Sequence, residues 1–174
     1  MITVIACTNR PNSYSLKVAE YYINLLKEKS VPCTLIDLNT LPEGYLFSAL
    51  YHNQGKDLIF NSIKEKISSS EKFVFVVPEY NGSFPGVLKA FIDGLDYPAS
   101  FKNKKCALVG LSSGVMGGSL ALSHLTDILN YLGMHVLASK PRITRIEKTF
   151  INGEITDAVV KDLIELQVKD LLQF

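Results

Sequence analysis

The sequence lacks tryptophan, a long apolar run and an excess of either charge. No apolar stretch approaches the roughly 18 residues that a membrane span needs, and Met1 leads into Ile2 and Thr3 without the basic residues of a secretory signal. Lysine and arginine total 18 against 17 acidic residues, a formal net charge of +1. A dedicated nucleic-acid-binding protein usually carries a clear basic excess. We therefore expect neither a membrane nor a nucleic acid as a partner.

Cysteine and histidine are scarce as well. The three cysteines lie in or beside apolar runs, so we interpret them as small buried residues in a reducing compartment, which favours a cytoplasmic protein. They are Cys7, Cys33 and Cys106. The histidines have no metal-ligand spacing relative to the cysteines or the acids, and we expect no metal site. They are His52, His124 and His135.

What the chain does have is the composition of one globular domain. Its 174 residues are 47% hydrophobic and 20% charged, which supplies enough apolar material for a core and too little charge for a disordered chain. Neither a composition shift nor an internal repeat divides the chain, so residues 1–174 are predicted to form a single domain.

Apolar residues follow two alternating patterns along the chain. Short, nearly uninterrupted apolar runs predict strands covered on both faces, over residues 2–6, 35–38, 73–77, 106–111 and 136–138. Apolar residues at helical spacing predict helices over 16–26, 59–67, 87–95, 122–129 and 160–171, with Pro85 in the first turn of the third and Thr156 capping the last. This alternation predicts an α/β fold with a parallel sheet wound on both sides. In such a sheet the ligand lies outside the carboxyl ends of the strands.

Residues 7–15 connect the first predicted strand to a helix. The hydroxyl groups of Ser13 and Ser15, the free N–H groups of the helix start and the charge of Arg10 favour an anion site. The plainer interpretation is a capped helix start, with one of the two serines as the N-cap. The loop has neither the Gly-Lys-Ser/Thr of a Walker loop nor the Gly-x-Gly-x-x-Gly of a dinucleotide fold.

Residues 78–86 follow the third predicted strand. Pro78 ends the strand, and Asn81-Gly82 predicts a tight turn. Such a turn can present its N–H groups to a ring system, with Tyr80 as a flat apolar wall. The alternative is an ordinary connection between a strand and a helix.

Residues 110–119 follow the fourth predicted strand and are rich in glycine, which lets the backbone approach a ligand closely. The signal is weak alone, but this loop is predicted at the same sheet edge as the other two. Gly110-Leu111-Ser112-Ser113-Gly114 also matches the nucleophile elbow of a hydrolase. No acid and histidine follow at convincing strand ends, so we set that interpretation aside.

The three loops carry motifs that together resemble one family. The motifs are Thr8-x-Arg10-x-x-Ser13, then Pro78-Glu79-Tyr80-Asn81-x-Ser83-x-Pro85-Gly86-x-Leu88-Lys89 with Ile92-Asp93 beyond it, and Ser112-x-Gly114-x-x-Gly117-Gly118. They resemble the NAD(P)H-dependent FMN reductase family, a flavodoxin-like group that includes bacterial quinone, azo-dye and chromate reductases. The resemblance covers about residues 2–140. It implies a flavodoxin-like three-layer fold whose five-stranded parallel sheet has the strand order 2-1-3-4-5.

The resemblance also implies an FMN site. It assigns the phosphate to Thr8, Arg10, Ser13 and Ser15, the isoalloxazine to Glu79, Tyr80, Asn81 and Gly82, and the other side of the flavin to Ser112, Ser113, Gly114 and Gly117, with Tyr14 and Pro78 completing the site. No catalytic side chain is required, because the flavin N5 carries the chemistry.

The activity implied is that of an oxidoreductase. NADPH or NADH would donate a hydride to the flavin, and a small acceptor (a quinone, an azo compound, a metal oxyanion or free flavin) would take the electrons. A homodimer or homotetramer is also implied. Two alternatives stay open: a non-enzymatic flavodoxin-like electron carrier, which is usually strongly acidic, and a subunit that has lost its flavin.

The chain departs from the family pattern at three places. Cys7 stands where glycine is usual, so we expect a slightly different backbone course before the first loop and a buried, structural thiol. Gly94 stands where a tryptophan often follows the aspartate of the middle motif, and residues 141–150 match no known pattern.

Residues 41–55 form the longest predicted connection, and this connection is unusually apolar. Its apolar side chains are Tyr45, Leu46, Phe47, Leu50 and Tyr51. A long connection of this composition is not typical of disorder. Three interpretations stay open: a lid over the flavin, a subunit contact, or a short helix packed on its own domain.

Overall fold

Parallel strands form the middle layer of the computed structural model, which describes all 174 residues. The strands run in the order β2-β1-β3-β4-β5, which confirms the predicted order. Their bounds are β1 Ile2–Ala6, β2 Cys33–Asp37, β3 Lys72–Pro78, β4 Lys105–Leu111 and β5 His135–Val136. Every pairing in this sheet is parallel, so the carboxyl ends of the strands meet at one edge.

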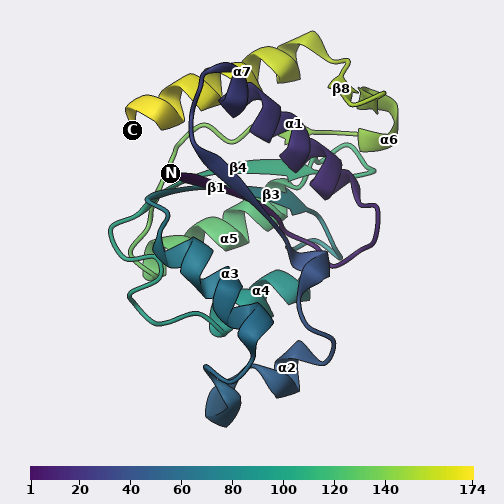
Figure 1. The fold of residues 1–174 in the computed structure, drawn as a ribbon. Coiled ribbons are helices and arrows are strands. Elements are labelled where there is room, and N and C mark those ends of the chain that lie inside the picture. The colour runs from purple at the N-terminus through teal and green to yellow at the C-terminus, as the bar shows by residue number, and fades with distance from the viewer.

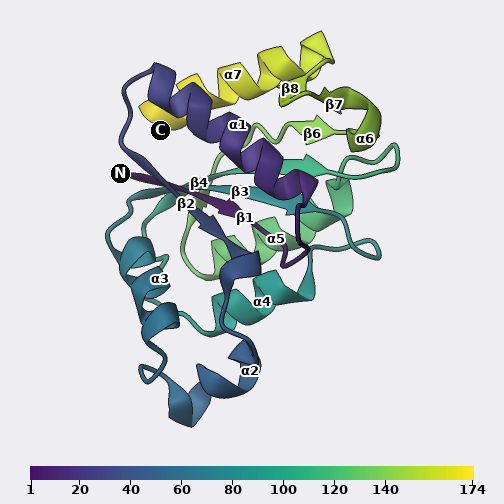
Figure 2. The same ribbon diagram turned by 45° about the vertical axis from the view of Figure 1, so that its right-hand side comes forward.

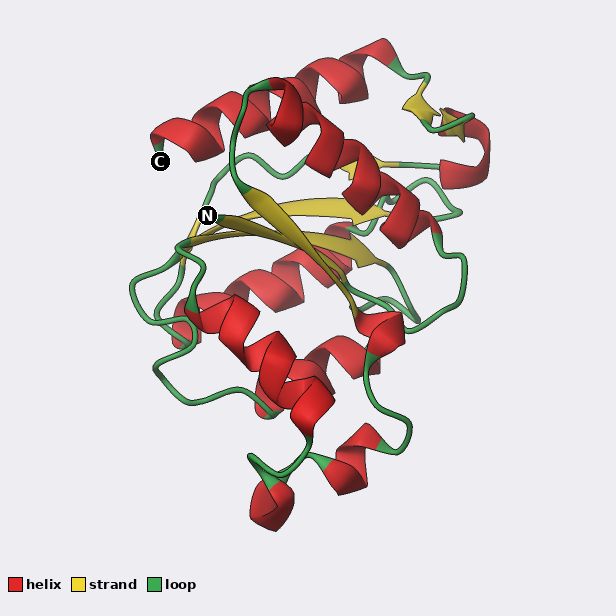
Figure 3. Cartoon of the chain, in the orientation of Figure 1, coloured by secondary structure: helices red, strands yellow, loops and turns green.

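Helices cover both faces of the sheet (Figure 1). Helix α1 (Tyr14–Glu28) and helix α7 (Ala158–Gln173) lie on one face, and α3 (Leu58–Ser68), α4 (Gly86–Asp93) and α5 (Ser119–Tyr131) lie on the other. Figure 3 shows the strands as a layer between the two sets of helices. None of the helices is both long and apolar enough to span a membrane.

Alternate residues of each strand enter different cores. Val74 and Val76 of β3 pack in the cluster that contains α1 and α7, whereas Phe73 and Phe75 pack in the cluster that contains α3, α4 and α5. Successive side chains of a strand point to opposite faces, so both faces of β3 must be apolar. This requirement explains why the strands are continuous apolar runs rather than alternating ones.

Three helix starts test the capping predictions. Ser13 caps α1, since its side chain accepts a hydrogen bond from the N–H of Leu16. The prediction of Thr156 for the last helix is wrong, because the carboxylate of Asp157 caps α7. Asp157 is favoured because its short side chain accepts from two N–H groups of the first turn. Pro85 precedes the first turn of α4 rather than lying within it.

The edge beside β4 holds two short strands rather than one. β5 pairs with Lys105 and Cys106 at the start of β4, and β6 (Arg142–Ile143) pairs with Gly110 and Leu111 at its end. The chain then forms α6 (Ile146–Thr149) and a hairpin of β7 (Phe150–Ile151) and β8 (Glu154–Ile155). None of β6 to β8 was predicted, because elements this short leave no periodic pattern in the sequence.

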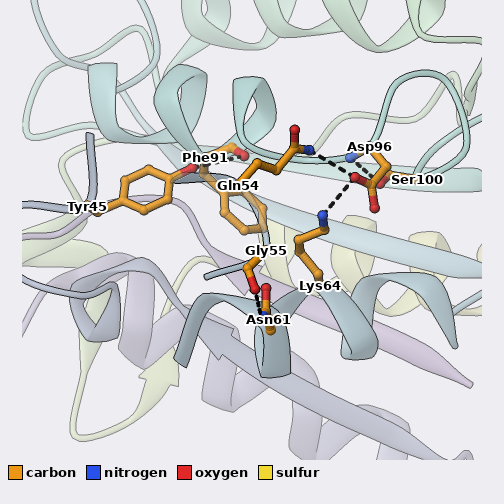
Figure 4. Close-up of polar contacts among 8 residues, drawn as sticks. All are labelled: Tyr45, Gln54, Gly55, Asn61, Lys64, Phe91, Asp96 and Ser100. Carbon is orange, nitrogen blue, oxygen red and sulfur yellow. Dashed lines mark hydrogen bonds and ion pairs between the residues drawn. The ribbon is translucent and has the colours of Figure 1, made fainter. Parts of the chain in front are cut away.

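Residues 41–55 pack on their own domain. They contain α2 (Tyr45–Ser48) and a 3₁₀ turn over Tyr51–Asn53, and Tyr45 and Leu50 belong to the core. In Figure 4 the Tyr45 hydroxyl points to the backbone of Phe91 in α4. The same hydroxyl donates a 2.8 Å hydrogen bond to the carbonyl of Ala90, the preceding residue. Of the three interpretations, a short helix packed on its own domain is therefore the one that describes these contacts.

Three further hydrogen bonds lie at the end of this segment (Figure 4). Gln54 Nε2 and Lys64 Nζ both donate to Asp96 Oδ1, at 3.1 and 2.7 Å. The side chain of Asn61 donates to the carbonyl of Gly55 at 2.8 Å. These contacts tie the segment to α3 and to the residues that follow α4.

The same packing explains why residue 94 is a glycine. A Cβ atom at this position would lie 2.7 Å from Leu50 Cδ2 and 2.8 Å from Phe60 Cζ, and it would also overlap the Tyr45 hydroxyl. Tyr45 and its neighbours thus fill the space next to Gly94, where the family pattern often has a tryptophan side chain.

Candidate functional site

The loops that follow β1, β3 and β4 meet at the carboxyl edge of the sheet and line one cavity of about 560 Å³. Its lining residues are Thr8, Arg10, Pro11, Asn12, Ser13, Tyr14, Ser15, Pro78, Glu79, Tyr80, Asn81, Leu111, Ser112, Ser113, Ile146 and Glu147. We call it the cofactor cavity. In Figure 2 the start of α1, the end of β3 and the segment around α6 lie at the same edge of the sheet, where the strands end.

Most of the predicted site residues line the cofactor cavity, and Gly82, Gly114 and Gly117 do not. Gly82 forms a turn, with a φ of +76°. At Gly117 the φ is +59°, and a Cβ atom would lie 2.8 Å from Arg142 Cβ. These two glycines shape the loops that carry the lining residues.

The loop after β1 has the features of an anion site. The N–H groups of Tyr14 and Ser15 have no intrahelical partner, because they begin α1. Ser15 Oγ is buried and has no hydrogen-bond partner in the protein. Arg10 is the only cationic residue that lines the cavity. Free N–H groups, an unpaired hydroxyl and one guanidinium are suited to a phosphate group.

The loop after β3 contains a rigid turn. Tyr80 and Ser83 exchange two backbone hydrogen bonds, of 2.8 and 3.1 Å, and Asn81 and Gly82 between them both have positive φ angles. This is the two-residue turn for which Asn-Gly is preferred, which confirms the predicted tight turn. Ser83 Oγ and His124 Nδ1, 3.0 Å apart, also connect the turn to α5.

The tight turn leaves polar groups free. Its own hydrogen bonds do not use the N–H groups of Asn81 and Gly82. Next to it, Glu79 Oε2 is buried without a partner. A buried polar atom without a partner costs free energy, and a bound ligand can supply the missing hydrogen bond.

The loop after β4 is organised by Ser112. Its hydroxyl accepts a hydrogen bond from the N–H of Gly117 at 2.9 Å and donates to the carbonyl of Gly114 at 3.1 Å. These two hydrogen bonds fix the conformation of the loop. The Ser112 hydroxyl has no histidine partner that would make it a nucleophile. This geometry agrees with setting the hydrolase interpretation aside.

Five lining residues were not predicted: Pro11, Asn12, Leu111, Ile146 and Glu147. The first three lie inside or next to recognised motifs, so the loop boundaries could have indicated them. Ile146 and Glu147 lie in residues 141–150, where no motif was found. Only the pairing of β6 with β4 brings them to the cavity.

Cys7 is a buried structural residue, as expected. Its N–H donates to the carbonyl of Val76 at 3.0 Å, so the backbone still pairs with β3 at the position where the family usually has glycine. Burial raises the pKa of the Cys7 thiol well above its ordinary value, which keeps the sulfur protonated. No group of three or more histidine, cysteine or acidic residues has the arrangement of a metal site.

Comparisons with known proteins agree with this arrangement. An NAD(P)H-dependent FMN reductase of Pseudomonas aeruginosa is 29% identical over 167 residues, which cover 93% of this chain and 88% of that protein. A 2-hydroxy-1,4-benzoquinone reductase of a Burkholderia species is 29% identical over 145 residues, 82% of this chain and 76% of that protein.

A solved structure shares the fold. The flavoenzyme NAD(P)H:(acceptor) oxidoreductase FerB of Paracoccus denitrificans superposes with a TM-score of 0.79 at 24% identity, over 99% of this chain and 94% of that one. The model of the NADPH-dependent FMN reductase family matches residues 1–144. The chain therefore belongs to the NADPH-dependent FMN reductase family, and it is an FMN-dependent NAD(P)H oxidoreductase.

Proposed function

We propose that FMN binds in the cofactor cavity, with its phosphate at the start of α1 and its ring beside the tight turn over residues 80–83. The observation that carries this proposal is the pair of buried, unpartnered atoms Ser15 Oγ and Glu79 Oε2, which belong to two residues of the same cavity. Ser15 lies in the first turn of α1 and Glu79 directly follows β3, so a ligand that satisfies both must span the cavity.

Separate groups of the cavity would bind separate parts of FMN. Arg10, Thr8, Ser13, Tyr14 and Ser15 would hold the phosphate through charge, hydroxyl groups and the N–H groups of the helix start. On the ring side, Pro78, Glu79, Tyr80, Asn81 and Gly82 would contact the isoalloxazine, and Ser112, Ser113, Gly114 and Gly117 would close the remaining side.

When bound, FMN accepts a hydride from NADPH or NADH and passes the electrons to an acceptor. The chain would bind FMN and orient it. None of the predicted contacts needs a side chain to move a proton. The unused N–H groups of Asn81 and Gly82 would stabilise negative charge at the ring edge. We propose a small acceptor, a quinone, an azo compound, a metal oxyanion or free flavin.

An absorption spectrum of the purified protein tests the cofactor, and anaerobic mixing with NADH or NADPH tests the activity. We expect a yellow protein whose flavin absorbance bleaches rapidly with at least one nicotinamide. A yellow protein that neither nicotinamide bleaches would point to an electron carrier. A colourless protein that does not bind added FMN would contradict the proposal.

We further propose that the chain is a single cytoplasmic domain that forms a homodimer or homotetramer. The support for assembly is the exposed apolar surface of residues 45–53, where Phe47 and Tyr51 are 84% and 82% exposed. A second cavity of about 470 Å³ lies between this surface and the start of α4, with Gly86 and Val87 in its lining.

Sedimentation of wild-type protein and of Phe47→Asp tests the assembly. We expect a stable dimer or tetramer for the wild type and a shift toward the monomer for the variant, because a charge at a buried contact is unfavourable. Glu43→Asp, in the same segment but without a change of charge, is the control. A wild type that sediments as a 19.3 kDa monomer at micromolar concentration would contradict the assembly.

A further inference from the structure

Ile146 and Glu147, at the end of the segment 143–147, line the cofactor cavity, although they follow the loops whose motifs identify the family. Three backbone hydrogen bonds join this segment to the loop after β4. Ser112 N–H donates to Ile143 at 3.1 Å, Ile146 N–H donates to Ser112 at 3.0 Å, and Arg145 N–H donates to Gly114 at 2.8 Å. The segment therefore has a set position relative to that loop.

The packing of Ile146 in the core fixes the position of Glu147, the next residue along the chain. Ile146 is 3% exposed and packs in the core that contains α1 and α7. Arg145 has a φ of 46°, a left-handed conformation that is uncommon for a residue with a side chain and persists where surrounding contacts impose it. The carbonyl of Thr144 accepts a hydrogen bond from Thr149 Oγ1 at 2.8 Å. These contacts present Glu147 to the cavity.

Glu147 is exposed, and its carboxylate has hydrogen-bonding capacity that the protein itself does not use. Its one hydrogen bond is with Ser113 Oγ, which lies 3.4 Å from Glu147 Oε1, a long distance for such a bond. A carboxylate accepts hydrogen bonds and does not donate them. Its partner on a bound ligand must therefore be a donor such as a hydroxyl group, and a phosphate placed against it would be repelled.

The parts of FMN differ in charge and in the hydrogen-bond donors they carry. The phosphate is an anion that is suited to Arg10 and the start of α1, whereas the ribityl chain carries several hydroxyl donors. We propose that Glu147, together with Ser113, binds the ribityl hydroxyl groups of FMN. This inference rests on the proposed binding of FMN in the cofactor cavity, and it adds a binding residue beyond residues 1–144, the part of the chain that the family model matches.

Three flavins separate the possible contacts of Glu147. Lumiflavin has the ring alone, riboflavin adds the ribityl chain, and FMN adds the phosphate. Each is titrated into the full-length protein freed of flavin, for the wild type, Glu147→Ala and Glu147→Gln. Glu154→Ala, on β8 and outside the cavity, is the control for the loss of one negative charge.

We expect Glu147→Ala to weaken FMN and riboflavin by the same factor, about ten-fold, and to leave lumiflavin unchanged. Glu147→Gln keeps the size and one acceptor oxygen, so its loss should be smaller. Glu154→Ala should bind all three flavins like the wild type. Thermal unfolding of the flavin-free variants shows whether they fold equally well.

Each other outcome overturns the inference. Tighter FMN binding with unchanged riboflavin binding in Glu147→Ala would place the carboxylate against the phosphate. Equal weakening of all three flavins would place it against the ring, and no change would remove it from the site. A wild-type protein that binds none of the flavins would instead contradict the proposed function, which keeps the two failures distinct.

Discussion

The hydroxyl groups of Thr8 and Tyr80 lie 2.7 Å apart and form a hydrogen bond between the residues that follow β1 and β3. Thr8 Oγ1 also accepts a hydrogen bond from the N–H of Arg10 at 3.2 Å. The side chain of Thr8 thus positions both the ring of Tyr80 and the backbone of Arg10. In the proposed complex this side chain connects the contacts to the ring with those to the phosphate.

Removal of the Tyr80 hydroxyl tests this connection. Tyr80→Phe keeps the aromatic wall and loses a neutral hydrogen bond of about 0.5–1.5 kcal/mol, so FMN should bind about 2- to 12-fold more weakly. Fluorescence titration of the flavin measures the change. Tyr97→Phe, which alters an exposed tyrosine outside the cavity, is the control. Unchanged affinity in Tyr80→Phe would show that the bond does not position the cofactor site.

Loss of the Arg10 side chain should weaken the binding of FMN and leave the binding of riboflavin unchanged. A charge-assisted hydrogen bond contributes about 1.5–3 kcal/mol, so Arg10→Ala should weaken FMN about 10- to 150-fold. Riboflavin lacks the phosphate and should bind the wild type and the variant equally.

Lys17→Ala is the control for Arg10→Ala, because it removes a cation of α1 that does not line the cofactor cavity. It should not change the preference for FMN over riboflavin. If Arg10→Ala also left this preference unchanged, the phosphate would lie elsewhere.

Gly94 should tolerate no side chain. Gly94→Ala places a methyl group against Tyr45, Leu50 and Phe60, and such overpacking costs about 1–3 kcal/mol of unfolding free energy. In a chain of this size each kcal/mol lowers Tm by about 2–4 °C. Gly86→Ala is the matched control, since a Cβ atom there meets nothing within 4 Å.

The double variant Tyr45→Phe/Gly94→Ala identifies the cause of that loss. Without the Tyr45 hydroxyl the added methyl group has more room. Gly94→Ala should therefore lower Tm less in the Tyr45→Phe background than in the wild type. Strictly additive losses of Tm would mean that Tyr45 and residue 94 do not compete for space.

Alkaline pH should destabilise the fold through a buried thiol. Burial raises the pKa of Cys106 from 9.0 to about 12, so the folded state keeps a proton that the unfolded state loses above pH 9. This contribution is complete below pH 9 and falls by about 1.4 kcal/mol for each pH unit up to pH 12.

Urea unfolding at pH 8 and pH 10 measures that loss of stability. Cys106→Ala should lose about 1.4 kcal/mol less than the wild type between these values, because it has no thiol to ionise there. Cys33→Ala is the control, since Cys33 is only partly buried and should reproduce most of the wild-type loss. Identical losses in the wild type and Cys106→Ala would refute the role of this thiol.

Much of the fold follows from local patterns in the sequence. The apolar run over residues 73–77 became β3, and the helical spacing over 122–129 became part of α5. Such patterns are readable because burial on both faces of a sheet, or along one side of a helix, imposes its own period on neighbouring residues. The tight turn at Asn81-Gly82 is similarly local, since it depends on the conformational freedom of two residues.

The family and most lining residues of the cofactor cavity could also be predicted from the motifs, since the motifs are contiguous and parallel strands bring their ends to one edge. The folded chain was needed to find that Glu147 joins Ser113 and that Tyr45 fills the space beside Gly94. These contacts join residues that are far apart in the chain, and neither partner carries a local signal of the other. Long-range packing selects such pairs, so the folded chain is needed to find them.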